Sequence, residues 1–190
     1  MEELILNAAM KLFLDDGYNN VTIRKIAKAI EYSPATIYLY FKDKDEIFFT
    51  LQKIAFEKFH DLQNSIQVIE DPTERLTAHG WSYIKFALEN HEYYDLMFIM
   101  NDPIKKLTCP EDWQIGISSY ELLKKNVREC MEAGVMKVAD VETASFAIWS
   151  FVHGLVALVI KRGFMIPKEH HDYMINGAFD FFSNLITKDK

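Results

Sequence analysis

Hydroxyl-bearing and basic side chains gather in one short stretch of this chain, residues 22 to 46, which reads TIRKIAKAIEYSPATIYLYFKDKDE. Hydroxyl and ammonium groups donate hydrogen bonds to phosphate oxygens, and small side chains such as threonine also contact thymine methyl groups. In this stretch Thr36, Tyr38 and Tyr40 supply hydroxyls, and Arg24 and Lys44 supply positive charge. These residue types therefore favour binding to a nucleic acid, through its phosphates and through base edges.

The charge of the chain is distributed unevenly. Residues 21 to 44 hold five basic and two acidic side chains, whereas the whole chain carries a net charge of −7 at pH 7. Phosphates are met by a local basic face, so the acidic total does not exclude a DNA-binding protein. The composition, 49% apolar and 26% charged, is ordinary for a globular protein, and only 7 glycines and 5 prolines favour an all-α fold.

Two short helices joined by a tight turn are predicted to position these side chains. Apolar residues at helical spacing indicate an amphipathic helix over residues 22 to 30. Ser33 as N-cap and Pro34 at the first helical position then start a second helix. Asp43 and Glu46 resemble a capping box at the start of a third. This is the helix-turn-helix arrangement, in which the second helix enters the major groove.

The same stretch resembles the DNA-binding domain of the TetR family of bacterial transcriptional regulators. The family's T-x-R-x-I-A helix, T-[IL]-Y-x-[YH]-F recognition helix and following K-x-K-[DE]-[ED] are matched in order and spacing by residues 22–27, 36–41 and 42–46. The resemblance implies operator contacts at Thr22, Thr36, Tyr38, Tyr40 and Lys44. Together with the residues argued from their own chemistry, the expected DNA-binding set is Thr22, Arg24, Pro34, Ala35, Thr36, Tyr38, Tyr40 and Lys44.

One residue departs from the family pattern. The family usually has glycine in the turn between the two helices, where this chain has Glu31. A non-glycine residue in the left-handed region is uncommon and costs about 1 kcal/mol. Either the turn differs here, or Glu31 carries that strain.

The rest of the chain also has helical patterns, so the expected fold is all-α. We expect an N-terminal three-helix helix-turn-helix domain of residues 1–46 and a C-terminal helical bundle of residues 47–190 that binds ligand and forms a dimer. A core of about 45 residues is marginal alone, so the first domain should depend on packing against the second. Apolar periodicity and capping residues predict the other helices over residues 3–15, 44–68, 71–90, 91–100, 113–133, 140–162 and 168–187.

The C-terminal third is unusually apolar. The run 144–160, ASFAIWSFVHGLVALVI, is apolar on nearly all sides but is shorter than a membrane span and contains Ser, His and Gly. A helix of this kind is more often buried in a core and an interface. With the apolar stripe of the last helix it suggests a four-helix bundle across a two-fold axis. The expected dimer contacts are Phe151, Leu155, Ala178, Phe181 and Phe182.

A short W-x-x-x-H-G cluster, Trp149, His153 and Gly154, resembles a C-terminal domain type within the TetR family that is named for those letters. The family implies a ligand pocket between the helices of this domain, although plain core packing explains the same residues. A pocket lined by aromatic and methionine side chains would favour a hydrophobic, neutral or weakly polar effector. The expected ligand-binding residues are Trp81, Ile84, Met97, Phe98, Trp113, Ile117, Tyr120, Trp149 and His153.

Other classes of protein have little support. Phosphate-binding loops, metalloprotease motifs and nucleophile elbows do not occur in the sequence. His170 and His171 are adjacent and would point in different directions on a helix, so neither a metal nor a cofactor is expected. The amino end, MEELILNAAMKLF, does not resemble a signal peptide, and with two cysteines, Cys109 and Cys130, a reduced cytoplasmic protein is expected.

The function that the sequence favours is a homodimeric repressor that binds a palindromic operator and responds to a small hydrophobic molecule. It would not be an enzyme and would not enter a membrane. The alternative is a hydrophobic-ligand carrier, or an enzyme, with a vestigial DNA-binding head.

Overall fold

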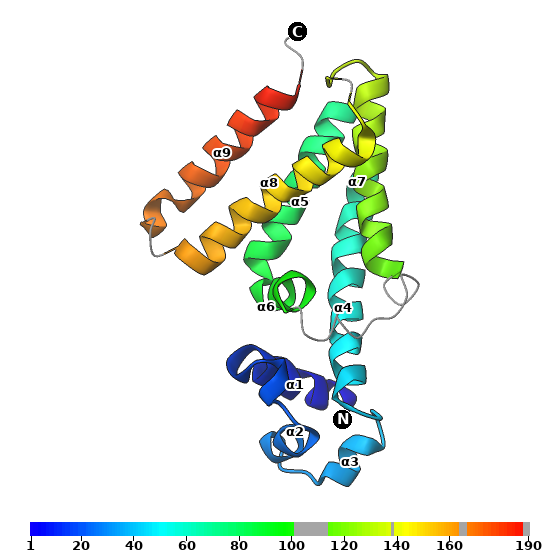
Figure 1. Cartoon of the computed structure of the whole chain (residues 1–190), viewed down its shortest axis with the longest axis vertical. Helices are drawn as coiled ribbons and strands as arrows, with labels where there is room; N and C mark the ends of the chain where they lie inside the picture. The colour runs from blue at the N-terminus through cyan, green and yellow to red at the C-terminus, as the bar shows by residue number, and fades with distance from the viewer. Residues whose placement is uncertain (101–113, 138, 164–166, 188–190) are drawn as a thin grey trace. The chain divides into compact units, whose positions relative to one another are not determined.

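The computed structural model describes residues 1–100, 114–137, 139–163 and 167–187, and this part of the chain is built from helices (Figure 1). The expected all-α fold is confirmed; the only extended pairing among the described residues is an isolated bridge between Met136 and Thr187. The chain divides into two compact units, Met1–Lys58 with Glu92–Ile115, and Phe59–His91 with Gly116–Lys190. The functional boundary at residue 46 stays a prediction. Residues 101–112, which lie between two of the predicted helices and include Cys109, are outside the described residues.

The first unit contains the helix-turn-helix segment. In it α1 packs against α2, and α2 against α3. Its helices are α1 (Glu2–Asp16), α2 (Ile23–Ala29), α3 (Pro34–Tyr38), the first part of α4 (Lys44–Ser65), α6 (His91–Tyr94) apart from its first residue, and a π-helical turn, Asp95–Ile99.

Local hydrogen bonds explain where α3 and α4 begin. The Ser33 hydroxyl accepts from the backbone N–H of Thr36 at 3.3 Å. Asp43 Oδ1 accepts from the N–H of Glu46 at 2.9 Å, and Glu46 Oε2 accepts from the N–H of Lys42 at 2.6 Å. The predicted capping box is therefore present, with Glu46 reaching the residue before the cap. Such caps satisfy N–H groups that have no partner inside the helix.

The core of the first unit extends beyond the first 46 residues. The rings of Phe13 and Tyr18 pack edge-on against Phe48 of α4, with centroids 5.5 and 5.4 Å apart. Leu96 of the π-helical turn is fully buried in the same core, and its carbonyl accepts a hydrogen bond from the Gln52 amide at 2.8 Å. The helix-turn-helix thus takes part of its core from α4 and from residues far along the chain.

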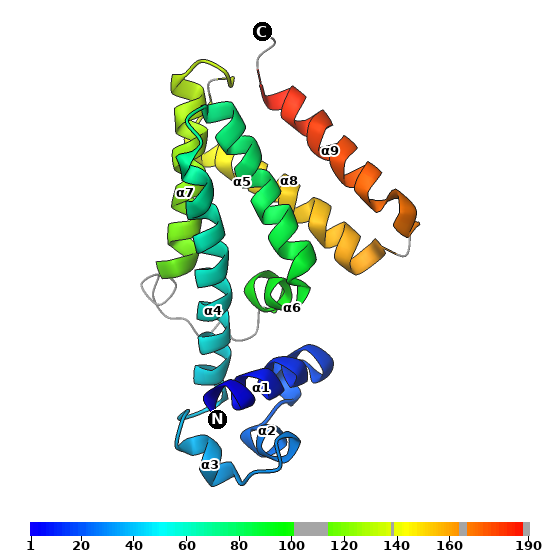
Figure 2. The same ribbon diagram turned by 180° about the vertical axis from the view of Figure 1, so that it is seen from behind.

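The second unit is a helical bundle in which α5 packs against α8, and α8 against α9 (Figure 2). Asp71 and Asp140, the first residues of the helices predicted over 71–90 and 140–162, cap α5 and α8 and accept from the backbone N–H groups of Glu74 and Thr143, both at 2.8 Å. Its elements are the end of α4, a 3-10 turn at Ile66–Val68, α5 (Pro72–Glu89), α7 (Gln114–Glu132), α8 (Val141–Arg162), a 3-10 turn at Lys168–His170, and α9 (His171–Ile186).

Gly80 sets the contact between α5 and α9. A Cβ atom at this position would lie 2.7 Å from the ring of Phe179, which is too close for any side chain. The neighbouring Trp81 packs against the same ring, with centroids 4.5 Å apart. A larger residue at position 80 would have to turn the Phe179 ring or move α9 away from α5.

Helix α8 is, by length and composition alone, apolar enough to cross a membrane, with a mean hydropathy of 1.9. Its buried residues Ser145, Ile148, Val152 and Val156 follow helical spacing and form one face. On the other side Phe146 and Leu158 are exposed. A helix with one packed face and one exposed apolar face suits an interface between protein copies.

The turn after α2 is a Schellman motif with Glu31 at its left-handed position. Glu31 has a φ of 60° and is the one non-glycine residue with positive φ among those described. The N–H of Tyr32 bonds to the carbonyl of Ala27 at 2.9 Å, and that of Glu31 to Lys28 at 3.2 Å. These are the two bonds of the motif, whose left-handed residue is usually glycine. The turn is therefore regular, and Glu31 carries the strain.

We expect Glu31→Gly to raise the free energy of unfolding by up to about 1 kcal/mol, because glycine adopts positive φ without steric cost. Glu31→Ala is the matched control, since it removes the carboxylate but keeps the Cβ atom that causes the strain. Urea unfolding of both variants measures the difference. Equal stability of the two variants would contradict this account of the turn.

Candidate nucleic-acid interface

The start of α2 presents Thr22 and Arg24 at the surface. Thr22 is the N-cap, and its hydroxyl oxygen accepts a hydrogen bond from the backbone N–H of Lys25 at 3.2 Å. A hydroxyl that accepts in this way keeps its own proton for donation to a phosphate. Arg24, in the first turn, is exposed. Both predicted residues are thus accessible from solvent.

Two buried residues fix the orientation of α3. Ile37 is fully buried, and Phe41, one turn later, is 4% exposed; both belong to the core of the first unit. Phe41 lies beyond the end of α3, but its N–H bonds to the Ile37 carbonyl at 3.0 Å, as in a helix. Residues four apart lie on one face of a helix, so this face points inward. The opposite side of α3 must then face solvent.

The predicted contact residues of α3 lie on that outer side or at its edges. Tyr38 is 57% exposed and Tyr40 is 46% exposed, which is high for tyrosine. Ala35 is exposed, and Pro34 and Thr36 lie at its edges. These five residues thus bring three hydroxyl groups to the solvent-facing part of this segment.

The ammonium group of Lys44 is bound within the protein and is not fully solvated. Its ammonium donates to the carbonyl oxygens of Tyr18 at 2.9 Å and of Val21 at 3.1 Å, and it lies 4.1 Å from the centre of the Tyr18 ring. The Tyr18 hydroxyl in turn donates to the Asp45 carboxylate. Lys44 thus braces the segment that leads into α2. Its contact with a phosphate stays a prediction.

The basic side chains of this segment are partly used inside the protein. Besides Lys44, Lys25 pairs with Asp16, at 3.2 Å between Nζ and Oδ2. Arg24, Lys28 and Lys42 are exposed. The hydroxyl groups are therefore at least as prominent on this surface as the positive charges.

Sequence reasoning missed the most exposed large apolar side chain of the segment. Leu39, directly after α3, is 81% exposed, and Tyr32 in the turn is 46% exposed. A helical count would have found Leu39, since it lies two residues from both Ile37 and Phe41 and hence opposite the buried face.

The predicted effector residues do not form one group. Met97 and Phe98 belong to the first compact unit, where the Phe98 ring packs against Phe56 with centroids 5.8 Å apart. Trp113 lies outside the described residues. The others belong to the second unit, where Ile84 is buried and Ile117 half-buried.

Within the second unit, an aromatic cluster joins α7 and α8. Trp149 lies between Tyr120 and His153, with ring centroids 5.8 and 6.1 Å away. His153 Nδ1 is 2.9 Å from the Tyr83 hydroxyl, and burial lowers the pKa of His153. His153 is therefore a neutral partner of Tyr83 at pH 7. Trp81 faces away from this cluster, against α9.

A narrow apolar cavity lies between α5, α8 and α9, with an internal volume of only about 30 Å³. Charged side chains are missing from its described lining. Cys130 in its wall donates a hydrogen bond to the Pro72 carbonyl, and burial raises the pKa of this thiol to about 11. The cavity is lined by Thr73, Leu76, Thr77, Gly80, Cys130, Val135, Met136, Ile148, Val152, Phe179, Phe182, Ser183, Ile186 and Thr187.

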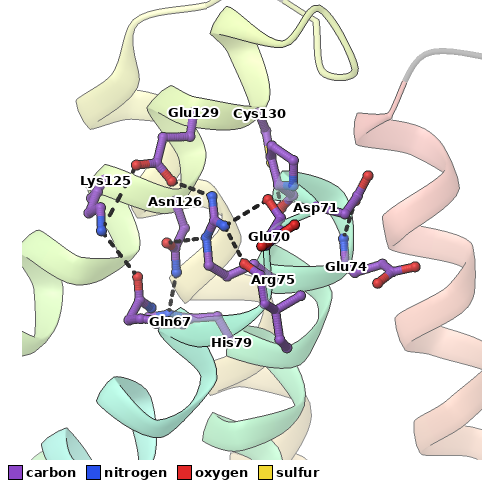
Figure 3. A network of polar contacts seen from close by, with 12 residues as sticks. Gln67, Glu70, Asp71, Glu74, Arg75, His79, Lys125, Asn126, Glu129 and Cys130 are labelled. Atoms are coloured by element: carbon purple, nitrogen blue, oxygen red, sulfur yellow. Dashed lines mark hydrogen bonds and ion pairs between the residues drawn. The ribbon is translucent and has the colours of Figure 1, made fainter.

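A buried polar network ties α5 to α7 (Figure 3). The Arg75 guanidinium donates to the Glu129 carboxylate and to the carbonyls of Ile69 and Glu70 at the end of the preceding turn. Its Nε–H donates to Asn126 Oδ1 at 3.3 Å. A buried charge is tolerated only with such a full set of partners. This network was not predicted, because nothing local in the sequence links residues 75 and 129.

The network determines the protonation of His79. Because Arg75 can only donate, Asn126 accepts with its oxygen and turns its amide nitrogen to His79 Nδ1, 3.0 Å away. Nδ1 must then accept, so the ring proton sits on Nε2, which is 3.0 Å from the Gln63 amide nitrogen. The Gln63 amide oxygen has no partner among the described residues. When the Gln63 amide group is turned by 180°, this oxygen accepts the Nε2 proton of His79. The chain of bonds runs from α7 through α5 to α4.

The predicted dimer residues lie on α8 and α9. Phe151 and Phe182 stack on each other inside the protomer, with centroids 4.0 Å apart and rings 5° from parallel. Phe181 is 67% exposed, while Leu155 and Ala178 are half-buried. Phe181 therefore belongs to an outer face, and the Phe151–Phe182 pair holds α8 to α9.

Comparison with known proteins gives two matching family models. The model described as bacterial regulatory proteins, tetR family, matches residues 5–51, and that described as Tetracyclin repressor-like, C-terminal domain, matches residues 76–179. A relative, the HTH-type transcriptional regulator HbdR of Aromatoleum sp. (strain CIB), is 28% identical over 155 residues. That region covers 78% of this chain and 66% of the relative.

Solved structures share the fold. The TetR family transcriptional regulator PfmR from Thermus thermophilus matches with a TM-score of 0.77 at 24% identity, over 95% of this chain and 97% of that one. The transcriptional regulator FadR from Bacillus subtilis, crystallised in complex with stearoyl-CoA, has a TM-score of 0.73 at 19% identity, over 95% and 96% of the two chains. At these identities the likeness concerns the fold alone.

The buried His79 should make stability depend on pH. Burial lowers its pKa from 6.5 to about 4, so between these values the unfolded chain binds a proton that the folded protein excludes. The free energy of unfolding should therefore fall by about 3 kcal/mol as the pH drops from 6.5 to 4, and the slope that His79 adds should fade to almost nothing by about pH 8.

Urea unfolding at pH steps from 7 to 4.5 tests this, with the slope of the wild type compared with that of His79→Gln. Glutamine can still hydrogen-bond but does not titrate. His91→Gln, at the start of α6, is the control and should keep the wild-type slope. A His79→Gln variant with the same pH dependence as the wild type would refute the assignment.

Proposed function

The chain belongs to the TetR family of bacterial DNA-binding transcriptional regulators, and on that premise we propose that it is a repressor, modulated by a hydrophobic small molecule, that binds a palindromic operator as a dimer. The observation that carries the proposal is the outer surface of α3. Exposed tyrosines on a segment that is anchored by two buried residues contribute little to packing. Their hydroxyls can instead donate hydrogen bonds to the phosphates of a DNA backbone. The protein would act in the bacterial cytoplasm.

On the DNA, α3 enters the major groove and its hydroxyls donate to phosphates. Tyr38 and Tyr40 lie on the exposed side, Thr36 lies beside them, and Thr22 and Arg24 reach the backbone from the start of α2. Pro34 and Ala35 allow the start of α3 to approach the bases closely. Lys44 adds its charge and keeps the segment before α2 in place.

A dimer is supported by the exposed apolar side chains on α8 and α9. Large apolar side chains are exposed along both helices, and exposed apolar surface of this kind marks protein interaction sites. A two-fold contact of these helices with a second copy would cover them. The exposed residues are Phe146, Leu158, Tyr173, Met174, Phe181 and Leu185.

The effector site would lie in the second unit. The cavity beside Gly80 and Phe179 has an apolar lining with hydroxyls from Thr73, Thr77 and Ser183, which suits a neutral molecule. Because the cavity is narrow, a larger molecule must displace the Phe179 ring. A charged ligand would lose its hydration without an ionic partner there.

Helix α4 would carry the response. Its residues 44–58 belong to the first unit and 59–65 to the second, so one continuous helix passes through both. A shift of its end, where Gln63 is tied to His79, would bias the spacing of two recognition helices that must reach successive major grooves. Couplings of this kind are typically about 1–3 kcal/mol.

The alternative is a hydrophobic-ligand carrier, or an enzyme, in which the helix-turn-helix has lost its function. Sequence-specific DNA binding separates the two. Selection from random duplexes should enrich one palindromic site for the repressor and no site for the alternative.

Tyr38→Phe should weaken binding to the selected operator by about 1–2 kcal/mol per half-site, because it removes one hydrogen bond to a charged group and keeps the ring. The loss should be about equal for all sequences, since phosphates carry no base information. Tyr93→Phe on α6 is the control and should bind as the wild type does. Titration by fluorescence anisotropy measures both, and unchanged binding in Tyr38→Phe would count against the proposed surface.

Phe181→Glu should convert the dimer to a soluble monomer, because a charge would be buried without a partner in the interface. Phe182 is less suitable, since its ring stacks on Phe151 within the protomer. Val68→Glu, at an 82% exposed position outside α8 and α9, should leave the dimer intact. Sedimentation equilibrium at micromolar concentration gives the answer. A wild type that is already monomeric would disprove the proposal.

Effector binding should change the fluorescence of Trp81, which packs on the Phe179 ring of the cavity. We expect neutral apolar molecules to change this signal and to alter operator affinity in the same concentration range. Trp81→Phe should remove most of the optical change and keep the effect on DNA. If polyanionic metabolites alone release or tighten the operator, the apolar site is wrong.

A further inference from the structure

Leu39 occupies an unusual place for a large apolar side chain. It follows α3 directly, keeps a right-handed helical conformation with φ −73° and ψ −20°, and donates its N–H to the Thr36 carbonyl at 3.3 Å. It is 81% exposed. A single exposed leucine is common on protein surfaces. This one lies in the centre of the surface that the proposed function assigns to the operator.

The helical arrangement makes the outermost row of this surface apolar. Leu39 is one turn after Ala35, and both lie opposite Ile37, which is fully buried. Hydroxyl-bearing residues follow on each side of this row, with Thr36 and Tyr40 on one flank and Tyr38 on the other. The surface thus has an apolar ridge between two sets of hydrogen-bond donors.

The chemistry of the major groove offers a partner for such a ridge. Hydroxyls on its flanks suit the phosphates, whereas an alkyl side chain can neither donate nor accept a hydrogen bond at a base edge. The one apolar group that bases present in this groove is the 5-methyl of thymine. Because α3 has five residues, it is about 7.5 Å long, and the groove is about 12 Å wide, so both ends of the helix can approach the bases.

We propose that Leu39 contacts the 5-methyl group of a thymine and thereby specifies a T·A pair at one position of each operator half-site. The inference rests on the proposed function, and goes beyond it by naming a residue that reads sequence and the base that it reads. Tyr38 and Tyr40 then hold the register on the backbone, and Leu39 supplies discrimination. Removal of one buried methyl group should weaken binding about four-fold per half-site.

The test uses the operator selected by the full-length wild type and a set of duplexes in which one thymine per half-site is replaced by deoxyuridine. This change removes the methyl group and keeps the Watson–Crick pair. For the wild type, one position should show the four-fold loss. For Leu39→Ala, the methylated and unmethylated duplexes at that position should bind equally. Tyr38→Phe is the control, which should bind more weakly yet keep the four-fold difference.

A second variant tests base choice. Leu39→Gln places an amide where the methyl contact was, and glutamine pairs with adenine through two hydrogen bonds. Selection with this variant should change the preferred base at that one position from thymine to adenine. Because Leu39 is exposed, thermal melting of both variants should match the wild type.

Several results would overturn the inference. A four-fold deoxyuridine effect that persists in Leu39→Ala would assign the methyl contact to another residue. A wild type that is insensitive to deoxyuridine at every thymine would exclude methyl readout altogether. If Leu39→Ala leaves DNA binding unchanged and alters self-association in sedimentation, the leucine serves a protein contact. If the wild type selects no site at all, the proposed function itself fails, and this inference with it.

Discussion

The burial of Ile37 and Phe41 is the constraint on which the candidate interface depends. Ile37 of α3 and Phe41, which follows the helix, take one face of this segment into the core of the first unit, and so the other side chains of residues 34–40 lie at an edge or face solvent. Five residues of helix have almost no stability of their own. The surface proposed to meet DNA is thus held by packing, and the same core includes residues of α1, Phe48 of α4, and Leu96 in the π-helical turn. A mutation in this core would therefore alter the recognition surface even though it replaces none of the surface residues.

The second unit is held together in a different way. Its apolar contacts are complemented by one buried cation, Arg75, whose partners lie on α7 and at the end of the turn before α5. A buried guanidinium contributes little net stability but is costly to leave unpaired, so it penalises every arrangement in which α7 is shifted along α5. The same bonds fix the orientation of the Asn126 amide, and through it the tautomer of His79. This network therefore contributes more to the specificity of helix packing than to the free energy of unfolding.

Sequence and structure agree where the determinants are local. The helix caps at Ser33, Asp43, Asp71 and Asp140, and the strain at Glu31, involve partners within four residues, and each could be predicted from the chain alone. Lys44 could not, because its partners at Tyr18 and Val21 lie more than twenty residues away. For the same reason the aromatic residues of the body were gathered into one predicted pocket, whereas Met97 and Phe98 belong to the first unit. Periodicity gives the face of a helix but not the neighbour that covers it.

The position of the cavity suggests how ligand and assembly are connected. Phe179 and Phe182 line it from α9, and on the same helix Phe181 points outward to the surface proposed as the dimer contact. Gly80 leaves no space between α5 and the Phe179 ring, so a molecule that enters must displace α9 or turn that ring. Either movement changes the helix that presents the apolar outer face. An effector in this cavity would therefore act on the two-fold contact and on α5 at once. Since α5 carries Arg75 and His79, the displacement would also reach Gln63 at the end of α4.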